Sequence, residues 1–211
     1  MCFFTKQLKR LATLLLFVPL AGLCQEHHDA KQLQAEALVK TLRQGGHIIY
    51  LRHAQTDRDQ VDLDRSNLDN CATQRNLSQA GRAQALSIGE SIRTLNIPIG
   101  KVISSPFCRC KHTAELAFTK TEISYDLRFG LGTNKQETTL LAQALKRMLA
   151  TPPENKTNTV LVSHTANLKE ATGIWPEPEG AAYIFRPLPN NDFQYLGKLN
   201  PETWQRLASA P

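Results

Sequence analysis

The 211-residue sequence has no internal repeat, no low-complexity tract and, beyond residue 24, no long uninterrupted hydrophobic run. Its contents of hydrophobic residues (41%) and charged residues (21%) are ordinary for a folded protein, which excludes global disorder. A chain of this length suits one domain that can bury a sizeable core.

A strong excess of one charge is also missing. The formal net charge is +6, but Lys6, Lys9 and Arg10 lie in segment 1–24, which holds no acidic residue, so the remainder carries about +3. Such a mild charge gives no support for nucleic-acid binding. Basic side chains gathered in one pocket would still attract an anionic substrate.

Cysteine is scarce, and its spacing does not fit a metal site. Beyond segment 1–24 there remain Cys71, Cys108 and Cys110. The Cys-Arg-Cys pair has one intervening residue instead of the two to four usual at zinc sites, and no second Cys/His pair follows. The carboxylates of the long polar segment 54–76 lack the glycine and terminal glutamate of a calcium loop, and are typical of a solvated surface. We expect no metal or cofactor and a disulfide from Cys71 to either Cys108 or Cys110.

Residues 1–24 have the layout of a secretory signal. Basic residues precede an apolar run over 11–20, and small residues follow it. The run is too short for a stable membrane span. We expect cleavage after Cys24, export to a periplasmic compartment and one domain over 25–211. An uncleaved N-terminal anchor is the alternative.

Strand and helix patterns alternate along the rest of the chain. Short apolar runs predict strands at 47–51, 101–104, 122–125 and 159–162, with a hairpin from 181–186 and 193–199. Periodic apolar positions predict helices at 30–44, 78–95, 106–118, 137–149 and 201–208, with Ser78 as an N-cap and Pro106 in a first turn. This alternation predicts an α/β fold, a three-layer sandwich with a mostly parallel central sheet and helices on both faces.

Polar side chains follow three of the predicted strands. Arg52 and His53 end the first strand, His164 ends the fourth, and Arg109 falls in the first turn of the helix after the second. Ligands bind at the carboxyl ends of strands in open α/β sheets, so we expect these side chains to meet. Arginine forks match phosphate oxygens, and an imidazole can attack phosphorus and hold the phosphoryl group. Each residue alone is also compatible with a structural role, but their matching positions favour a phosphoryl-transfer site. The proline-rich segment 175–180 is expected to form a rigid loop beside it.

The residues around these positions resemble the histidine phosphatase superfamily, also called the phosphoglycerate-mutase-like family. Four segments carry the resemblance, in the family's order: Leu51–Thr56 (Arg-His-Gly signature, with Ala54 for glycine), Leu77–Ala85 (Leu-Ser-x-x-Gly-x-x-Gln-Ala), Ser104–Ala114 (Ser-x-x-x-Arg-x-x-x-Thr-Ala) and Val162–His164. The resemblance implies the phosphoglycerate-mutase-like fold and a metal-independent phosphatase acting on a small phosphorylated substrate. The signal layout points to an exported bacterial branch.

The resemblance also implies a role for each matched residue. His53 would be the nucleophile that becomes phosphohistidine, so one ring nitrogen must be neutral and the other held by a backbone carbonyl. Three further side chains would surround the phosphoryl group: Arg52 and Arg109 as clamps and His164 as a stabilising donor. Two residues of the same turn would contact substrate: Gln55 and Thr56.

The family's general acid has no counterpart here. Its branches place a glutamate in the loop after the third strand or an aspartate directly after the second histidine, where this sequence has Arg128-Phe129 and Thr165. Asp126 and Glu137 are nearby substitutes, each also compatible with a surface carboxylate. The sequence therefore supports an exported phosphomonoesterase. A phosphohistidine or envelope-glycan phosphatase and a catalytically weak phospholigand-binding protein are the alternatives.

Overall fold

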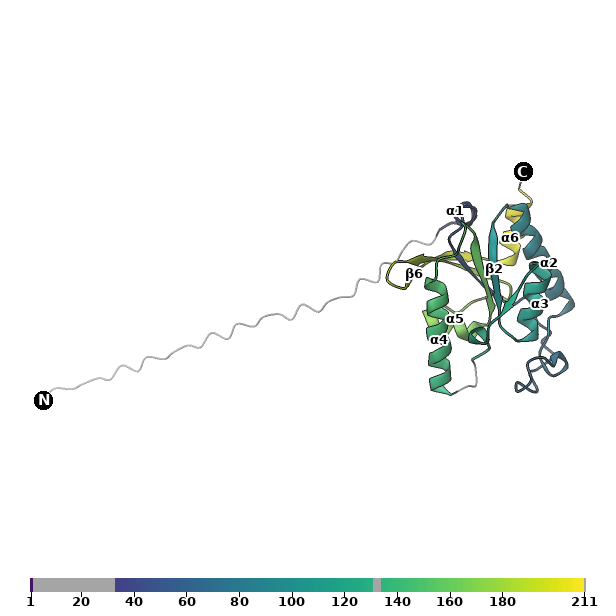
Figure 1. Ribbon diagram of the computed structural model, residues 1–211, viewed down its shortest axis with the longest axis horizontal. Helices are drawn as coiled ribbons and strands as arrows, with labels where there is room; N and C mark the ends of the chain where they lie inside the picture. The colour runs from purple at the N-terminus through teal and green to yellow at the C-terminus, as the bar shows by residue number, and fades with distance from the viewer. Residues whose placement is uncertain (2–32, 131–133, 211) are drawn as a thin grey trace.

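Six strands form one mixed sheet in the order β3-β2-β4-β1-β5-β6. The computed structural model describes residue 1, residues 33–130 and residues 134–210 (Figure 1). The strands are β1 Ile48–Arg52, β2 Ile99–Ser104, β3 Glu122–Ile123, β4 Asn158–Ser163, β5 Ala182–Leu188 and β6 Asp192–Leu199. The first four strands in the sheet order run parallel, and the hairpin β5–β6 adds to β1 antiparallel. The predicted mostly parallel sheet and C-terminal hairpin are therefore confirmed.

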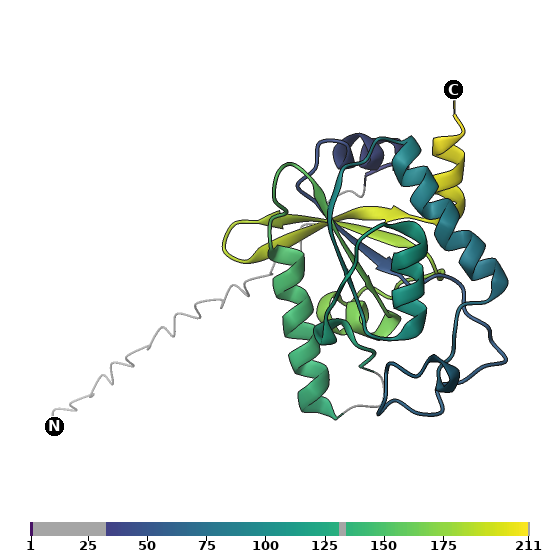
Figure 2. The same ribbon diagram turned by 45° about the vertical axis from the view of Figure 1, so that its right-hand side comes forward.

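Helices cover both faces of the sheet (Figures 1 and 2). They are α1 Ala35–Leu42, α2 Gln79–Thr94, α3 Cys108–Ala117, α4 Lys135–Ala150, α5 Thr165–Thr172 and α6 Pro201–Ala208. Apolar residues of α1, α2, α3 and α6 share one buried cluster with Ile49 and Leu51 of β1. Those of α4 and α5 share a second cluster with Ile48 and Tyr50. Successive residues of β1 thus face opposite layers, and both layers are buried, which is the three-layer sandwich expected from the alternating elements.

Two local predictions differ from the structure. Pro106 does not lie in a helical turn, because α3 begins at Cys108 with Phe107 as its N-cap. Helix α5 is absent from the predicted elements, since only Leu168 and Ala171 give its eight residues an apolar face. Ser78 is the N-cap of α2, as predicted, and its side chain accepts a hydrogen bond from the Gly81 N–H.

The long segment 54–76 is fastened to α3 by a disulfide between Cys71 and Cys108, with 5.7 Å between the two Cα atoms. Of the two expected pairings this is the one formed, and Cys110 is a buried free thiol. The bond closes a loop across 37 positions, which in the chain-entropy model stabilises the fold by roughly 4 kcal/mol. The cross-link therefore holds this polar segment close to the end of β2.

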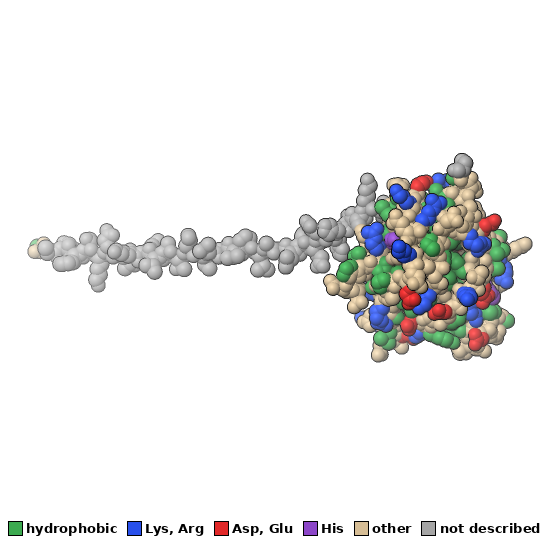
Figure 3. Space-filling model, turned by 45° about the horizontal axis from the view of Figure 1, so that its top comes forward, with side chains coloured by type: hydrophobic (Ala, Val, Ile, Leu, Met, Phe, Trp, Pro, Cys, Tyr) green, Lys and Arg blue, Asp and Glu red, His purple; other side chains and the backbone are tan. Residues whose placement is uncertain are grey.

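The predicted signal segment lies, apart from Met1, outside the described residues, so its cleavage and the boundary at residue 25 stay predictions. In the part of the chain that the structure describes, no helix is long and apolar enough to cross a membrane. On the face shown in Figure 3, basic and acidic side chains are interspersed with apolar and uncharged groups.

Candidate active site

The sheet brings the two predicted histidines together. Strands β1 and β4 are parallel neighbours with Arg52 opposite Ser163, so the next residues, His53 and His164, leave the sheet side by side. Their ring centroids are 5.5 Å apart. Arg109 reaches the same place from the first turn of α3, which follows β2 on the other side of β4. The strand-end argument therefore predicted the assembly correctly.

The turn after His53 is held by three residues of the predicted Leu-Ser-x-x-Gly-x-x-Gln-Ala pattern. The Gln55 carbonyl accepts a hydrogen bond from the Ser78 N–H (3.1 Å), and the Gln55 N–H donates to Gln84 Oε1 (3.0 Å). A Cβ at Gly81 would lie 1.8 Å from the Gln55 carbonyl oxygen, so only glycine lets α2 approach the turn. The spacing of this pattern thus reflects one task, fixing the backbone at residue 55.

Helix α3 is coupled to the same turn through Thr113. Its hydroxyl accepts a hydrogen bond from the Ala54 N–H (2.9 Å) and donates one to the Arg109 carbonyl (2.7 Å). Ala54 is fully buried, and it is not among the described residues with positive φ, so alanine can replace the family's glycine without backbone strain.

His53 has the tautomer that a nucleophile requires. Its side chain is buried, and Nδ1 lies 2.9 Å from the Ala54 carbonyl oxygen, which can only accept, so Nδ1 carries the proton and Nε2 has a free lone pair. Burial, followed by the positive charges of Arg109, Arg52 and Arg75, lowers the pKa of His53 well below its usual value. The ring is therefore neutral at pH 7.

We expect the ring protons of His53 to show no titration in NMR spectra as the pH falls from 8 to 6.5. A group whose pKa is lowered is neutral above that pKa, so its resonance should shift only at more acidic pH. N-acetylhistidine amide added to the same sample, with an ordinary pKa of about 6.5, is the internal control. A midpoint at or above that value for His53 would contradict the neutral-nucleophile assignment.

His164 is anchored from its backbone and its ring. Tyr50 Oη donates to the His164 carbonyl (2.6 Å), and Ser105 Oγ lies 2.8 Å from His164 Nε2. Ser105 Oγ also accepts from the Phe107 N–H (3.4 Å). We therefore assign the Ser105 hydroxyl as the donor to His164 Nε2, which leaves Nδ1–H as the donor of the His164 ring. Burial is also the main cause that lowers the pKa of His164.

Cys110 touches the same ring but is not suited to nucleophilic attack. Its Sγ lies 3.5 Å from His164 Nε2. Burial raises the pKa of the Cys110 thiol to about 12, so the thiolate is not formed at neutral pH. Cys110 is therefore not in a reactive form, whereas His53 Nε2 has a free lone pair.

Several buried guanidinium nitrogens in this site have no hydrogen-bond partner among the described residues. They are Arg52 Nε, Arg75 Nε, and both Nε and Nη2 of Arg109. Arg109 is fully buried, with its guanidinium 4.6 Å from the ring centroid of Phe107. Buried donors are almost always satisfied in proteins, and an unpaired charged donor is costly. These N–H groups are therefore the candidate donors for a bound anion, and we call the place where they lie the anion site.

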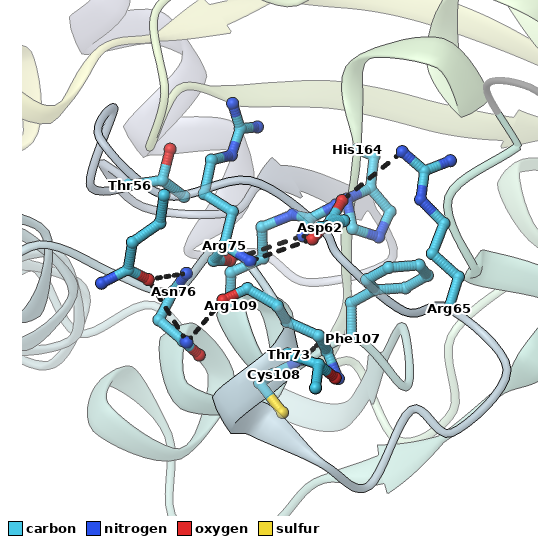
Figure 4. Close-up of polar contacts among 12 residues, drawn as sticks. Thr56, Asp62, Arg65, Thr73, Arg75, Asn76, Phe107, Cys108, Arg109 and His164 are labelled. Atoms are coloured by element: carbon cyan, nitrogen blue, oxygen red, sulfur yellow. Dashed lines mark hydrogen bonds and ion pairs between the residues drawn. The ribbon is translucent and has the colours of Figure 1, made fainter.

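Three charged residues of the site were missed by the sequence analysis. Arg75 is a third arginine whose charge acts on both histidines. Asp62 forms an ion pair with Arg109 (2.9 Å), and Glu179 forms one with Arg52 (3.3 Å) (Figure 4 shows Asp62, Arg75 and Arg109). The assignment of segment 54–76 to a solvated surface is thus wrong for Asp62 and Arg75. The one available signal was the segment's length, which is typical of functional loops.

A cavity of about 800 Å³ opens beside the anion site. Its wall includes Gln55 and Thr56, the two predicted substrate contacts, and the predicted loop 175–180 closes one side. Thr56 is fixed there by Glu179, which accepts from both its N–H (3.1 Å) and its hydroxyl (3.0 Å). The lining is almost entirely polar, and its charged members are Arg52, Arg58, Arg75, Glu177, Glu179 and Glu202.

The two carboxylates considered as general acids do not join this group. Asp126 is exposed, and its N–H bonds to Ser124 Oγ (3.3 Å). Glu137 is bonded to Arg128 (2.6 Å). Within residues 33–130 and 134–210, neither forms a hydrogen bond or ion pair with the histidines or arginines of the site. Within the described residues, no group of three or more His, Cys, Asp or Glu side chains is placed to hold a metal ion.

Comparisons with known proteins identify one family model and several solved structures that are similar to this chain. Residues 48–132 match the model of the histidine phosphatase superfamily (branch 1), whereas no curated protein matches the chain. Three similar structures are the protein histidine phosphatase SixA complexed with tungstate, a phosphoserine phosphatase from Entamoeba histolytica and a mycobacterial glucosyl-3-phosphoglycerate phosphatase.

The first has a TM-score of 0.53 at 15% identity, covering 74% of this chain and 97% of that chain. The second has a TM-score of 0.53 at 16% identity and covers 72% and 95%. The third has a TM-score of 0.52 at 15% identity and covers 74% and 100%. At these low identities, the structural similarity shows a shared fold and nothing more. Residues 48–132 thus match the histidine phosphatase superfamily (branch 1), and the chain shares its fold with these phosphatases.

Proposed function

We propose that the protein is a phosphatase that hydrolyses a small phosphomonoester through a phosphohistidine on His53. The observation that carries the proposal is the set of unpartnered guanidinium N–H groups around a buried, neutral histidine. A phosphoryl group bound there would satisfy those donors. The phosphatases of similar fold, which include a phosphoserine phosphatase, support the same reaction class.

In the first step, His53 Nε2 attacks phosphorus and forms a P–N bond, while the bond from phosphorus to the ester oxygen breaks. The leaving oxygen takes a proton from water, and the imidazolium is stabilised by its Nδ1–H bond to the Ala54 carbonyl. Arg52 and Arg109 bind the phosphoryl oxygens, and His164 Nδ1–H adds a donor. In the second step, water adds to phosphorus and loses a proton. The P–N electron pair then returns to Nε2, and orthophosphate leaves.

The proposed chemistry is metal-independent. Arg52, Arg75 and Arg109 supply positive charge around the transferring group, which is the stabilisation that phosphoryl transfer chiefly needs. In the same proposal the protein is exported. The disulfide and the signal layout of segment 1–24 support an oxidising compartment.

We expect the rate to depend steeply on the leaving group, because Asp126 and Glu137 lie outside the site and Glu179 is engaged as an acceptor from Arg52 and Thr56. The kcat/KM for aryl phosphates should fall as the pKa of the phenol rises from about 7 to about 10, and alkyl phosphates should be poorer still. Equal kcat/KM values across the series would show that a proton donor does serve the site.

Because no general acid has been identified, the proposal retains three alternatives: a phosphohistidine phosphatase, an envelope-glycan phosphatase and a phospholigand-binding protein. A phosphohistidine phosphatase has a nitrogen leaving group, and an envelope-glycan phosphatase would use the polar cavity for a sugar. Measurements of kcat/KM for a phosphohistidine peptide and for hexose phosphates decide between them. Tight orthophosphate binding without turnover of any ester would instead support a phospholigand-binding protein.

A further inference from the structure

Asp62 occupies an unusual position for a loop carboxylate. In the run Val61-Asp62-Leu63 the two apolar side chains are exposed, at 63% and 76% of their surface, whereas the Asp62 side chain is 7% exposed. Hydrophobic burial alone would favour the reverse orientation. The loop therefore turns a carboxylate inward at the expense of two apolar contacts, so the interactions made by that carboxylate must compensate.

Those interactions join two arginines through one oxygen atom. Asp62 Oδ1 accepts from Arg109 Nη1 at 2.9 Å and from the Arg75 N–H at 3.0 Å (Figure 4). Asp62 Oδ2 lies 3.6 Å from Arg65 Nη2 at the outer side of the pair. The two arginines come from α3 and from segment 54–76, so a single carboxylate sets their relative position.

The contact leaves the phosphate-binding edge of Arg109 open. A planar guanidinium grips an oxyanion best with the parallel N–H groups of Nε and Nη2. Both nitrogens of Arg109 are unpartnered among the described residues, and Asp62 holds the remaining nitrogen, Nη1. Asp62 is therefore beside the anion site and does not fill it. Its charge also offsets that of the fully buried Arg109 in the free protein.

We propose that Asp62 is a positioning residue, which fixes the Arg109 side chain so that its Nε–Nη2 edge faces the bound phosphoryl group. This role rests on the proposed phosphatase function. It assigns a task to segment 54–76, which the disulfide Cys71–Cys108 holds against the same helix.

The test uses Asp62→Ala and Asp62→Asn, with Asp64→Asn as the matched control. Asp64 lies in the same segment, but among the described residues its carboxylate accepts only from Ser66. We expect Asp62→Ala to lower kcat/KM for an aryl phosphate by at least 100-fold and to weaken the Kd for inorganic orthophosphate by at least 10-fold. Asp62→Asn keeps an oxygen acceptor without the charge, so its losses should be smaller, about 10-fold in kcat/KM. Asp64→Asn should stay within twofold of the wild type.

A double-mutant cycle separates positioning from folding. With Arg109→Ala already present, Asp62→Ala should weaken orthophosphate binding by less than twofold, because the side chain through which it acts is gone. Losses that multiply would overturn the proposal, as would orthophosphate binding by Asp62→Ala that equals or exceeds the wild type. If the alanine variant does not fold, the asparagine variant in the same cycle decides by the same criteria. A wild-type protein that neither binds orthophosphate nor turns over an ester would contradict the phosphatase function itself.

Discussion

Substituting His53→Ala is expected to lower kcat for an aryl phosphate by about 10⁴-fold or more, because it removes the only proposed bond-forming atom. The arginines stay in place, so the variant should still bind orthophosphate. The lost ring leaves the Ala54 carbonyl without its donor, which lowers the free energy of unfolding only modestly. The two hydrophobic clusters are unchanged, so the variant should fold. The measurement is steady-state turnover together with the melting temperature.

His112→Ala is the matched control for this experiment. His112 lies on α3 and bonds to no site residue in the part of the chain that the structure describes, so its loss should change turnover by less than twofold. Turnover by His53→Ala within tenfold of the wild type, in a protein that is folded, would exclude His53 as the nucleophile.

Substituting Arg109→Ala is expected to lower kcat/KM by about 10²- to 10³-fold, equivalent to 2.7–4 kcal/mol of transition-state stabilisation. Arg109→Lys keeps the charge but not the paired N–H groups, so it should recover only part of the loss. Arg109→Ala removes the buried ion-pair partner of Asp62, which costs about 3–5 kcal/mol of folding stability. Arg109→Lys weakens the same pair and should cost less. Kinetics should therefore be measured well below each variant's melting temperature.

Arg206→Ala is the control for Arg109. Arg206 forms an exposed ion pair with Glu36, and neither partner lies in the site. Exposed pairs contribute little, so kcat/KM should stay within twofold. If Arg109→Ala kept kcat/KM within fivefold of the wild type, Arg109 would not bind the transferring phosphoryl group.

The parts of the site that lie at strand ends could be predicted from the sequence. Arg52, His53 and His164 directly follow apolar runs. The parallel register of β1 and β4 then places the two histidines side by side. Arg109 was placed correctly because α3 starts at the end of β2. In these positions local pattern and topology give the same answer.

The loop residues could not be placed in this way. Asp62, Arg75 and Glu179 belong to segments without periodicity, and their burial depends on contacts across the fold that no local pattern encodes. The disulfide partner was ambiguous for a related reason. Cys108 and Cys110 are two residues apart on a helix and point to different sides, which spacing alone does not resolve. Helix α5 was missed because its apolar face is too short to show a period.

The central claim is a phosphohistidine on His53, and rapid quenching with a labelled aryl phosphate tests it most directly. We predict an acid-labile label that maps to His53, forms within the first turnover and disappears as orthophosphate is released. Turnover with no label on His53, or a label on another residue, would contradict the account.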